Sequence, residues 1–174
     1  MNKNFYSNKI SFMEFSELDE TDLQLLALLQ EDASLSNVAL AERVHVSPPT
    51  CLRRLKRLSE GGWIERQVAV LSRDRLGHGL QALVEVTLDR QHAEALDAFE
   101  ARAVAEPAVQ QCWRVSPGPD FVLVLHSRDM AEHLGLTQRL FTQDANVRNV
   151  KAFFASKRAK FGTQIALPSA EPRR

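Results

Sequence analysis

The 174-residue sequence lacks the features of several large protein classes. Its only two cysteines, Cys51 and Cys112, lie too far apart for a zinc site or a disulfide framework. No apolar run approaches the roughly 20 residues needed to cross a bilayer, and residues 1–15 lack the continuous apolar segment of a secretion signal. We therefore expect a cytoplasmic protein with no membrane partner, in which both cysteines are buried thiols.

Catalytic and metal-binding motifs are also missing. The five histidines show no metal-ligand spacing, and none stands at ligand spacing from a cysteine. The sequence contains no glycine-rich phosphate loop, no nucleophile elbow and no paired carboxylates in a cleft-like setting. It therefore predicts neither an enzyme nor a bound metal or cofactor, and we expect His92 and His133 on helix surfaces.

An excess of charge of one sign is absent as well, because 22 basic and 22 acidic residues give a formal net charge of zero. The charges are nevertheless unevenly distributed. Residues 14–22 hold five acids and no base, whereas residues 53–57 hold four bases and residues 148–160 hold five bases, both without an acid. Inference about a partner therefore has to rest on these local runs.

Two short helices are predicted near the start of the chain. Acidic side chains crowd the first turn of a helix over 19–30, where the helix dipole favours anions. Ser34, Ser36 and Asn37 can cap a second helix over 37–44. Its expected inward residues are Val38, Ala41 and Val44.

A third helix begins after Ser47, which can cap it, and Pro48 suits its first position because proline lacks an N–H. Its expected core stripe is Leu52, Leu55 and Leu58, and the glycine pair at 61–62 should end it. Three short helices, the third strongly basic, form a helix-turn-helix pattern. Residues 63–71 are expected to supply a strand or wing.

The second half of the sequence has a different pattern. Alternating apolar residues and 3.6-residue periodicity predict strand, helix, strand, strand, helix and strand in that order, which is the ferredoxin-like arrangement. The expected strands are 80–88, 109–115, 121–126 and 147–155, and the expected helices are 92–104 and 130–141. In the first of these helices the expected inward residues are Leu96, Phe99, Ala103 and Val104.

These patterns predict an α+β chain, with a helix-turn-helix (winged) domain followed by a ferredoxin-like βαββαβ domain. The predicted divisions are an arm over 1–17, a helix-turn-helix domain over 18–71, a hinge over 72–79, a second domain over 80–167 and a disordered tail over 168–174.

The basic run on the third helix is the most informative stretch. A solvated helix face usually mixes signs, because opposite charges four residues apart stabilise a helix. Here no acid follows until Glu60, so four cations within two turns should repel one another unless an external partner neutralises them. DNA phosphates do so, and the release of counterions drives the association. The four cations are Arg53, Arg54, Lys56 and Arg57.

The sequence resembles the Lrp/AsnC family of transcriptional regulators, from Leu18 to about Leu167. The stretches that carry the resemblance are LDETDLQLLALLQEDASLS, LAERVHVSPPTCLRRLKRLSEGGWIE, VAVLSRDRLG, LVEVTL and FFASKRAKF. The resemblance implies an N-terminal DNA-binding domain and a C-terminal domain for effector binding and assembly. It also implies a homodimer that assembles into tetramers or octamers, with amino acids as effectors.

For DNA, the helix that begins near Ser47 should enter the major groove, and dimer symmetry should require a pseudo-palindromic double-stranded site. We expect Thr50, Arg53 and Arg54 to read bases, because they lie toward the front of the helix. Lys56 and Arg57 should hold phosphates. Ser47 and Pro48 complete the expected DNA-binding set, since they lie at the helix N-terminus.

For the effector, the family carries a loop of the type Ser/Thr-Gly-acid-x-Asp-Tyr, and here the corresponding stretch is SPGPDF at 116–121. Asp120 matches the family's acid and would accept an ammonium group. The alternative is that it caps its own turn. By position in the family, Ala82, Phe153, Phe154 and Ala155 would line the same pocket, although sheet core or an oligomer interface also explains the two phenylalanines.

Two other functions remain open. An architectural protein could organise DNA through its oligomeric state without an effector. A siroheme-decarboxylase-like enzyme could share both domains, but the basic helix favours DNA over this analogy.

Overall fold

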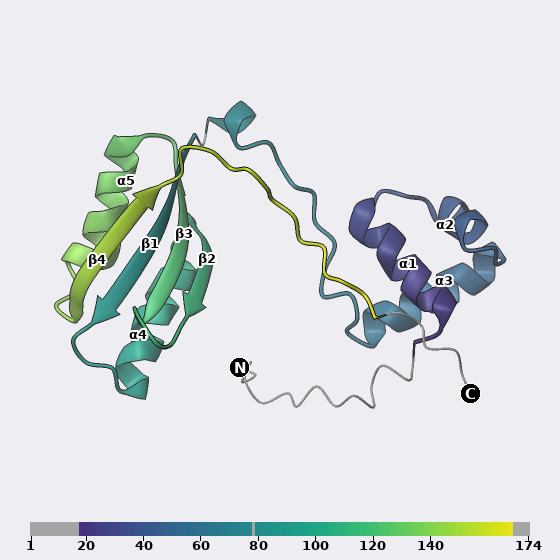
Figure 1. Cartoon of the computed structure of the whole chain (residues 1–174), viewed down its shortest axis with the longest axis horizontal. Coiled ribbons are helices and arrows are strands. Elements are labelled where there is room, and N and C mark those ends of the chain that lie inside the picture. Colours follow the sequence, from purple (N-terminus) through teal and green to yellow (C-terminus); the bar gives the residue numbers. More distant parts are fainter. Residues whose placement is uncertain (1–17, 78, 169–174) are drawn as a thin grey trace. The chain divides into compact units, whose positions relative to one another are not determined.

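A computed structural model describes residues 18–77 and 79–168, with the side chain of residue 74 left out (Figure 1). The described chain forms two compact units, residues 18–69 with 161–168, and residues 70–160. The chain thus leaves the first unit once and returns to it after the last strand. The predicted arm over 1–17, and all of the predicted tail except Pro168, lie outside the described residues.

The first unit contains the three predicted helices, α1 (Glu20–Glu31), α2 (Asn37–Arg43) and α3 (Pro48–Glu60). Asp19, Ser36 and Ser47 cap their N-termini through their side chains. Gly61 caps the end of α3, and Gly62 follows with a φ of 77°, in the left-handed region that glycine tolerates best. The helix pattern and its caps are confirmed.

The predicted inward faces of α2 and α3 were each wrong at one residue, whereas Ala41, Val44 and Leu58 are buried as predicted. On α2 the buried residues are Leu40 and Ala41, and Val38 is 53% exposed. On α3 the buried residues are Cys51 and Leu58, whereas Leu52 is 60% exposed. A small cysteine thus occupies the core position that the sequence reading gave to a leucine.

No strand is present at 63–71, where the described backbone is irregular. Trp63 and Ile64 instead pack against the core of the first unit. The expected strand of a wing is therefore not formed in this part of the chain. The expected hinge contains one short 3₁₀ turn, η2 (Asp74–Leu76).

The second unit is built on a four-stranded antiparallel sheet in the order β2-β3-β1-β4 (Figure 1). Its strands are β1 (Leu80–Leu88), β2 (Val109–Arg114), β3 (Phe121–Ser127) and β4 (Val147–Phe154). With the helices between them, this order is the predicted ferredoxin-like arrangement. The SPGPDF loop joins β2 to β3 and contains a cis bond between Ser116 and Pro117.

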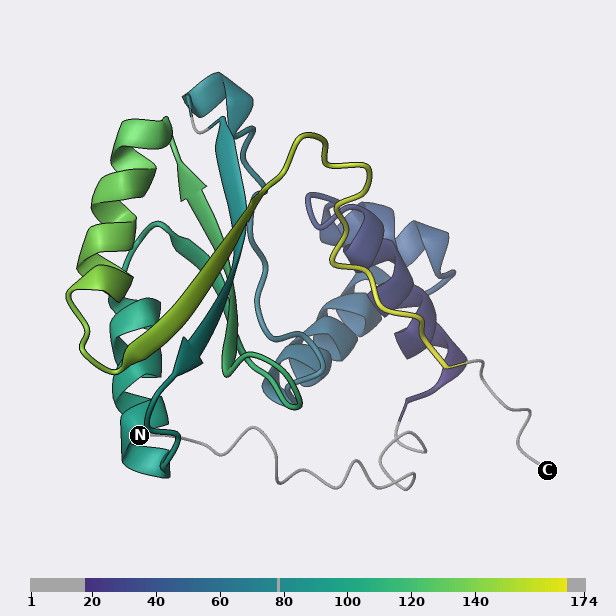
Figure 2. The same cartoon turned by 60° about the vertical axis from the view of Figure 1, so that its left-hand side comes forward.

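Helices α4 (Ala93–Ala105) and α5 (Met130–Thr137) cover one face of this sheet (Figure 2). A π-helical turn, η3 (Gln138–Thr142), extends α5. Alternate residues of β1 point into the core as predicted, and Phe99 and Ala103 of α4 are buried with them. Val104 was predicted inward but is 66% exposed.

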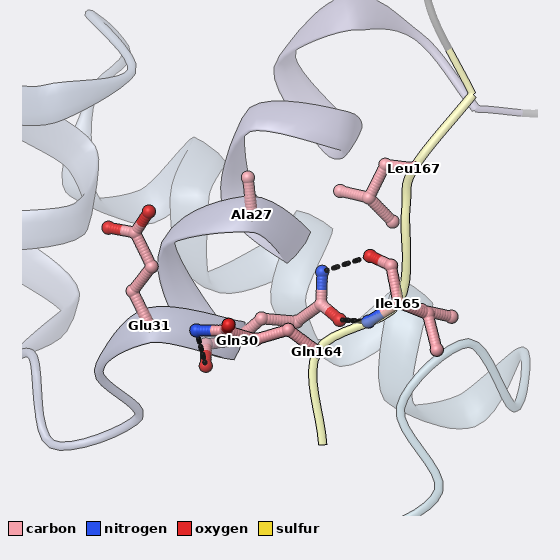
Figure 3. A pocket seen from close by; sticks show the side chains of 6 residues that line it. All are labelled: Ala27, Gln30, Glu31, Gln164, Ile165 and Leu167. Atoms are coloured by element: carbon pink, nitrogen blue, oxygen red, sulfur yellow. Dashed lines mark hydrogen bonds between the residues drawn. The ribbon is translucent and has the colours of Figure 1, made fainter. Parts of the chain in front are cut away.

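The segment after the last strand returns to α1. The side chain of Gln30 pairs with the backbone of Ile165, donating from Nε2 to the carbonyl at 3.2 Å and accepting from the amide at 2.7 Å (Figure 3). Leu167 packs against the core of the same unit. In the folded chain, residues 161–168 pack with the compact unit of the three N-terminal helices, whereas the sequence placed residues up to 167 in the second domain.

Candidate nucleic-acid interface and effector region

The N-terminus of α3 is held by short-range hydrogen bonds. Ser47 Oγ accepts from the amide of Thr50 at 3.4 Å and lies 2.9 Å from Thr50 Oγ1. Asn37 of α2 donates to the carbonyl of Pro48 at 2.9 Å. These contacts fix the turn between α2 and α3, and they engage the hydroxyl of Thr50 within the protein.

A buried carboxylate holds two of the four cations of α3. Asp22 is fully buried, and its Oδ1 lies 2.8 Å from Nη1 of Arg54. The same Nη1 lies 2.7 Å from Oδ2 of Asp19, and Arg57 contacts Oδ2 of Asp22. The inference that all four cations lack an internal counter-charge was therefore wrong, because acids 32 to 35 residues earlier supply it.

The protonation of Asp22 follows from these contacts. Burial alone would raise the pKa of this carboxyl, but hydrogen bonds from Arg57, from the amide of Asp19 and from Arg54 outweigh burial and lower it. Asp22 also completes a reciprocal capping box, in which Asp19 accepts from the amide of Asp22 and Asp22 accepts from the amide of Asp19. The carboxylate thus joins α1 to α3.

The outward face of α3 is defined by its exposed positions. Residues 49, 52, 53 and 56 recur at three-and-four spacing opposite the buried Cys51 and Leu58. Among the described residues Arg53 forms no ion pair, and Lys56 has only the distant Glu60, at 3.7 Å with both side chains about 70% exposed. Arg54 lies on the inner side of the helix, with 20% of its side chain exposed. The sequence reading missed Pro49 and Leu52, because it placed Leu52 in the core.

The candidate effector residues do not converge within one chain. Asp120 lies at one end of β1, where its Oδ2 accepts from the amide of Leu88 at 2.7 Å and from Gln91 Nε2 at 3.2 Å. Its own amide bonds to the carbonyl of Val86. Ala82 lies on β1 four residues before Val86, which is a distance of about 13 Å at strand spacing. The Asp120 side chain therefore accepts from the end of β1 and from Gln91, about 30 residues away in sequence, and not from the backbone of its own turn.

The other candidates lie on two faces of the sheet. Ala82 is opposite Phe154 on the face covered by the helices, and the amide of Ala155 bonds to the carbonyl of Gln81. Phe153 is opposite Leu83 on the open face. The structure thus groups Ala82, Phe154 and Ala155 at one end of β1, and it separates Phe153 from them.

His133, expected on a helix surface, is buried, at 4% exposure. Its ring meets Phe154 edge-on, with centroids 5.0 Å apart, and burial lowers its pKa.

Of the two free thiols, Cys51 is fully buried and Cys112 half-buried, and burial raises the pKa of Cys112 to about 11. Over residues 18–77 and 79–168, no helix is long and apolar enough to span a membrane. No group of three potential metal-ligand side chains was found in the same residues.

Comparison with known proteins assigns both units. Residues 18–65 match the winged helix-turn-helix DNA-binding family model, and residues 81–165 match the Lrp/AsnC ligand binding domain. The chain is 36% identical to the leucine-responsive regulatory protein of Rhizobium meliloti over 151 residues, covering 87% of this chain and 97% of that protein. It is 32% identical to the DNA-binding transcriptional activator DecR of Escherichia coli, covering 86% of this chain and 99% of that protein.

A solved structure supports the same assignment. A transcriptional regulator of Neisseria meningitidis, determined in complex with L-Met, superposes with a TM-score of 0.81 at 33% identity, covering 86% of this chain and 96% of that one. The order of the domains, the helix-turn-helix with its basic third helix, and the relatives agree with one another. The chain belongs to the Lrp/AsnC family of DNA-binding transcriptional regulators.

Proposed function

We propose that this chain regulates transcription by placing the outward face of α3 in the major groove of DNA, and that a small amino acid bound to the second unit modulates it. The observation that carries the proposal is the division of charge on α3. Arg54 and Arg57 are paired with a buried carboxylate, whereas Arg53 and Lys56 lie on the exposed outward face of the helix. A cationic face built on an anchored helix suits phosphates and base edges.

The roles of single residues follow from this geometry. Arg53 is the cation nearest the front of α3, so we assign it to a base edge, where arginine pairs best with guanine. Lys56 follows one turn later and suits a phosphate. Arg57, half exposed, has donors enough to contact Asp22 and a phosphate together. Arg54 and Thr50, expected to read bases, serve instead to position the helix.

An amino-acid effector is proposed for the second unit by similarity to the regulator solved with L-Met. Asp120 remains the candidate partner of the ammonium group, because only its Oδ2 is used by Leu88 and Gln91 and a carboxylate has a second oxygen. Ala82, Phe154 and Ala155 lie at the other end of β1. A pocket that includes both sets would therefore have to form between copies of the chain.

Self-association is proposed from the open face of the sheet. Leu83, Trp113 and Phe153 are 44%, 58% and 53% exposed there, and the register places them on one face. Large apolar patches of this kind mark interfaces. We propose that a dimer buries this face and that higher assemblies add the effector site. The two-fold symmetry would then require a pseudo-palindromic site. Because the proposed function acts on DNA, we also propose a cytoplasmic location.

The experiment that tests the proposal starts from a random-sequence pool of double-stranded DNA. Full-length protein selects its sites, and gel-shift titrations then compare the best site with a scrambled one, with and without each of the twenty amino acids. Light scattering on the same samples reports assembly. A selected site whose occupancy and assembly respond to one amino acid supports the whole proposal.

Two other outcomes would count against it. Selective binding that no amino acid changes would remove the effector and favour a DNA-organising protein. Equal binding to every sequence, or no binding at low salt, would overturn the assignment of α3 as a reader of DNA.

A further inference from the structure

Leu52 is an exposed apolar side chain in the middle of a cationic surface. It is 60% exposed on α3, and by helical spacing its neighbours on that face are Pro49, three residues earlier, and Lys56, four residues later. Arg53 is the next residue. The core of the first unit is completed without it, by Cys51 and Leu58 from the same helix. Packing of the monomer therefore gives no reason for a leucine at this position.

The position of Leu52 along the helix indicates what it meets. It is the fifth of the 13 residues of α3, within the N-terminal half that contacts base edges in helix-turn-helix proteins. In the proposed function Arg53 contacts a base edge and Lys56 a phosphate, so the side chain that lies between them on this face would approach the floor of the groove. A leucine has neither donor nor acceptor. On that floor the C5-methyl of thymine is the apolar group that each A·T pair presents.

From this geometry we infer that Leu52 is a specificity-determining residue that reads a thymine methyl group in the major groove. The inference rests on the proposed function and deepens it, because it names one base and the atom that is recognised. Burying one methyl group stabilises by about 0.8 kcal/mol, which corresponds to a preference of about fourfold for thymine over uracil at one base pair. The other DNA contacts of this helix face are those proposed above for Arg53 and Lys56.

The test uses the site selected from the random pool. Each thymine is replaced in turn by uracil, which keeps the base pair and removes only the methyl group. We expect wild-type full-length protein to lose about fourfold in affinity at one position of each half-site and to change little elsewhere. Leu52→Ala should bind the thymine site more weakly and should bind thymine and uracil equally.

Two matched variants separate this contact from other effects. Val38→Ala removes an exposed apolar side chain of α2 in the same unit and should keep the fourfold thymine preference. Arg53→Ala should weaken binding to both DNAs and also keep that preference. Because Leu52 is exposed, its alanine variant should retain the wild-type circular dichroism spectrum and melting temperature.

The outcomes are distinguishable. If the pool yields no preferred site, the proposed function fails and the inference fails with it. If a site is selected but wild type binds thymine and uracil equally at every position, only the inference is overturned. It is also overturned if Leu52→Ala retains the thymine preference of the wild type.

Discussion

The carboxylate of Asp22 on α1 lies 2.8 Å from the guanidinium of Arg54 on α3, and it is fully buried. It also contacts Arg57, so one buried acid supports two residues of the basic run. From the sequence alone, the four cations of this run are expected to repel one another. In the folded chain Arg54 and Arg57 pair with Asp22, whereas Arg53 and Lys56 face outward. The predictions below separate the anchoring residues from the DNA-facing ones.

Asp22→Asn should destabilise the first unit by roughly 3 kcal/mol, because it leaves two guanidinium groups beside a neutral amide in a partly buried site. The chain has two tryptophans, and Trp63 packs on the first unit while Trp113 belongs to the second. In a Trp113→Phe background, urea unfolding followed by Trp63 fluorescence would measure this loss. Glu42→Gln, an exposed acid of α2, is the matched control and should change stability by less than about 0.5 kcal/mol.

The same carboxylate predicts an acid limit for the first unit. Hydrogen bonds hold the pKa of Asp22 below its ordinary value of 3.8 in the folded state. The unfolded chain therefore takes up a proton at higher pH than the folded one, so the stabilisation is complete above about pH 5 and declines as pH falls through 4 and below. Trp63-monitored melts from pH 6 to 3 should show a steeper decline for wild type than for Asp22→Asn. Parallel curves would contradict this role.

Arg53→Ala should affect DNA binding, whereas Arg54→Ala should affect the stability of the first unit. Arg53 faces outward, so its loss should weaken DNA binding and leave the melting temperature near that of wild type. Arg54 is bound to Asp19 and Asp22, so its loss should lower stability while the folded protein keeps the wild-type dependence of affinity on salt. Lys56→Ala, at a proposed phosphate contact, should flatten the slope of log affinity against log salt by about one unit. A flattened slope for Arg54→Ala would return it to the DNA-contacting set.

Most of the secondary structure could be predicted from the sequence, because caps and periodicity are local signals. The register of the inward faces could not. Cys51 and Leu52 are neighbours, and the leucine was chosen as core although the cysteine occupies that position, while Leu55 and Leu58 pack as predicted. The prediction also placed Arg54 on the outer face. The partners of Arg54 lie more than 30 residues earlier, so only the packed helices show that it is paired. His133 was misplaced for a similar reason, since a polar residue on a helix is expected outside.

The returning segment should contribute measurably to the first unit. Leu167 is partly buried against its core and Gln30 makes two hydrogen bonds to the backbone of Ile165. We expect Leu167→Ala and Gln30→Ala each to cost about 1 kcal/mol in the free energy of unfolding reported by Trp63. Ile165→Ala is the control, because that side chain is 72% exposed and only its backbone is used. If all three variants match wild type, the segment does not support α1 in solution.

His133 predicts a pH response of the second unit that is independent of Asp22. Burial lowers its pKa below the ordinary 6.5, so the unfolded chain binds a proton that the folded one excludes, and stability should fall as pH drops from 7 toward 5. In a Trp63→Phe background, Trp113 fluorescence would follow this unit. His133→Leu should flatten the decline, whereas His92→Asn, which changes an exposed histidine and can still cap α4, should keep it.

Because His133 meets Phe154, a candidate for the effector region, His133→Leu should also remove part of any pH dependence in effector binding. An effector affinity that varies with pH equally in both proteins would show that the histidine acts on stability alone.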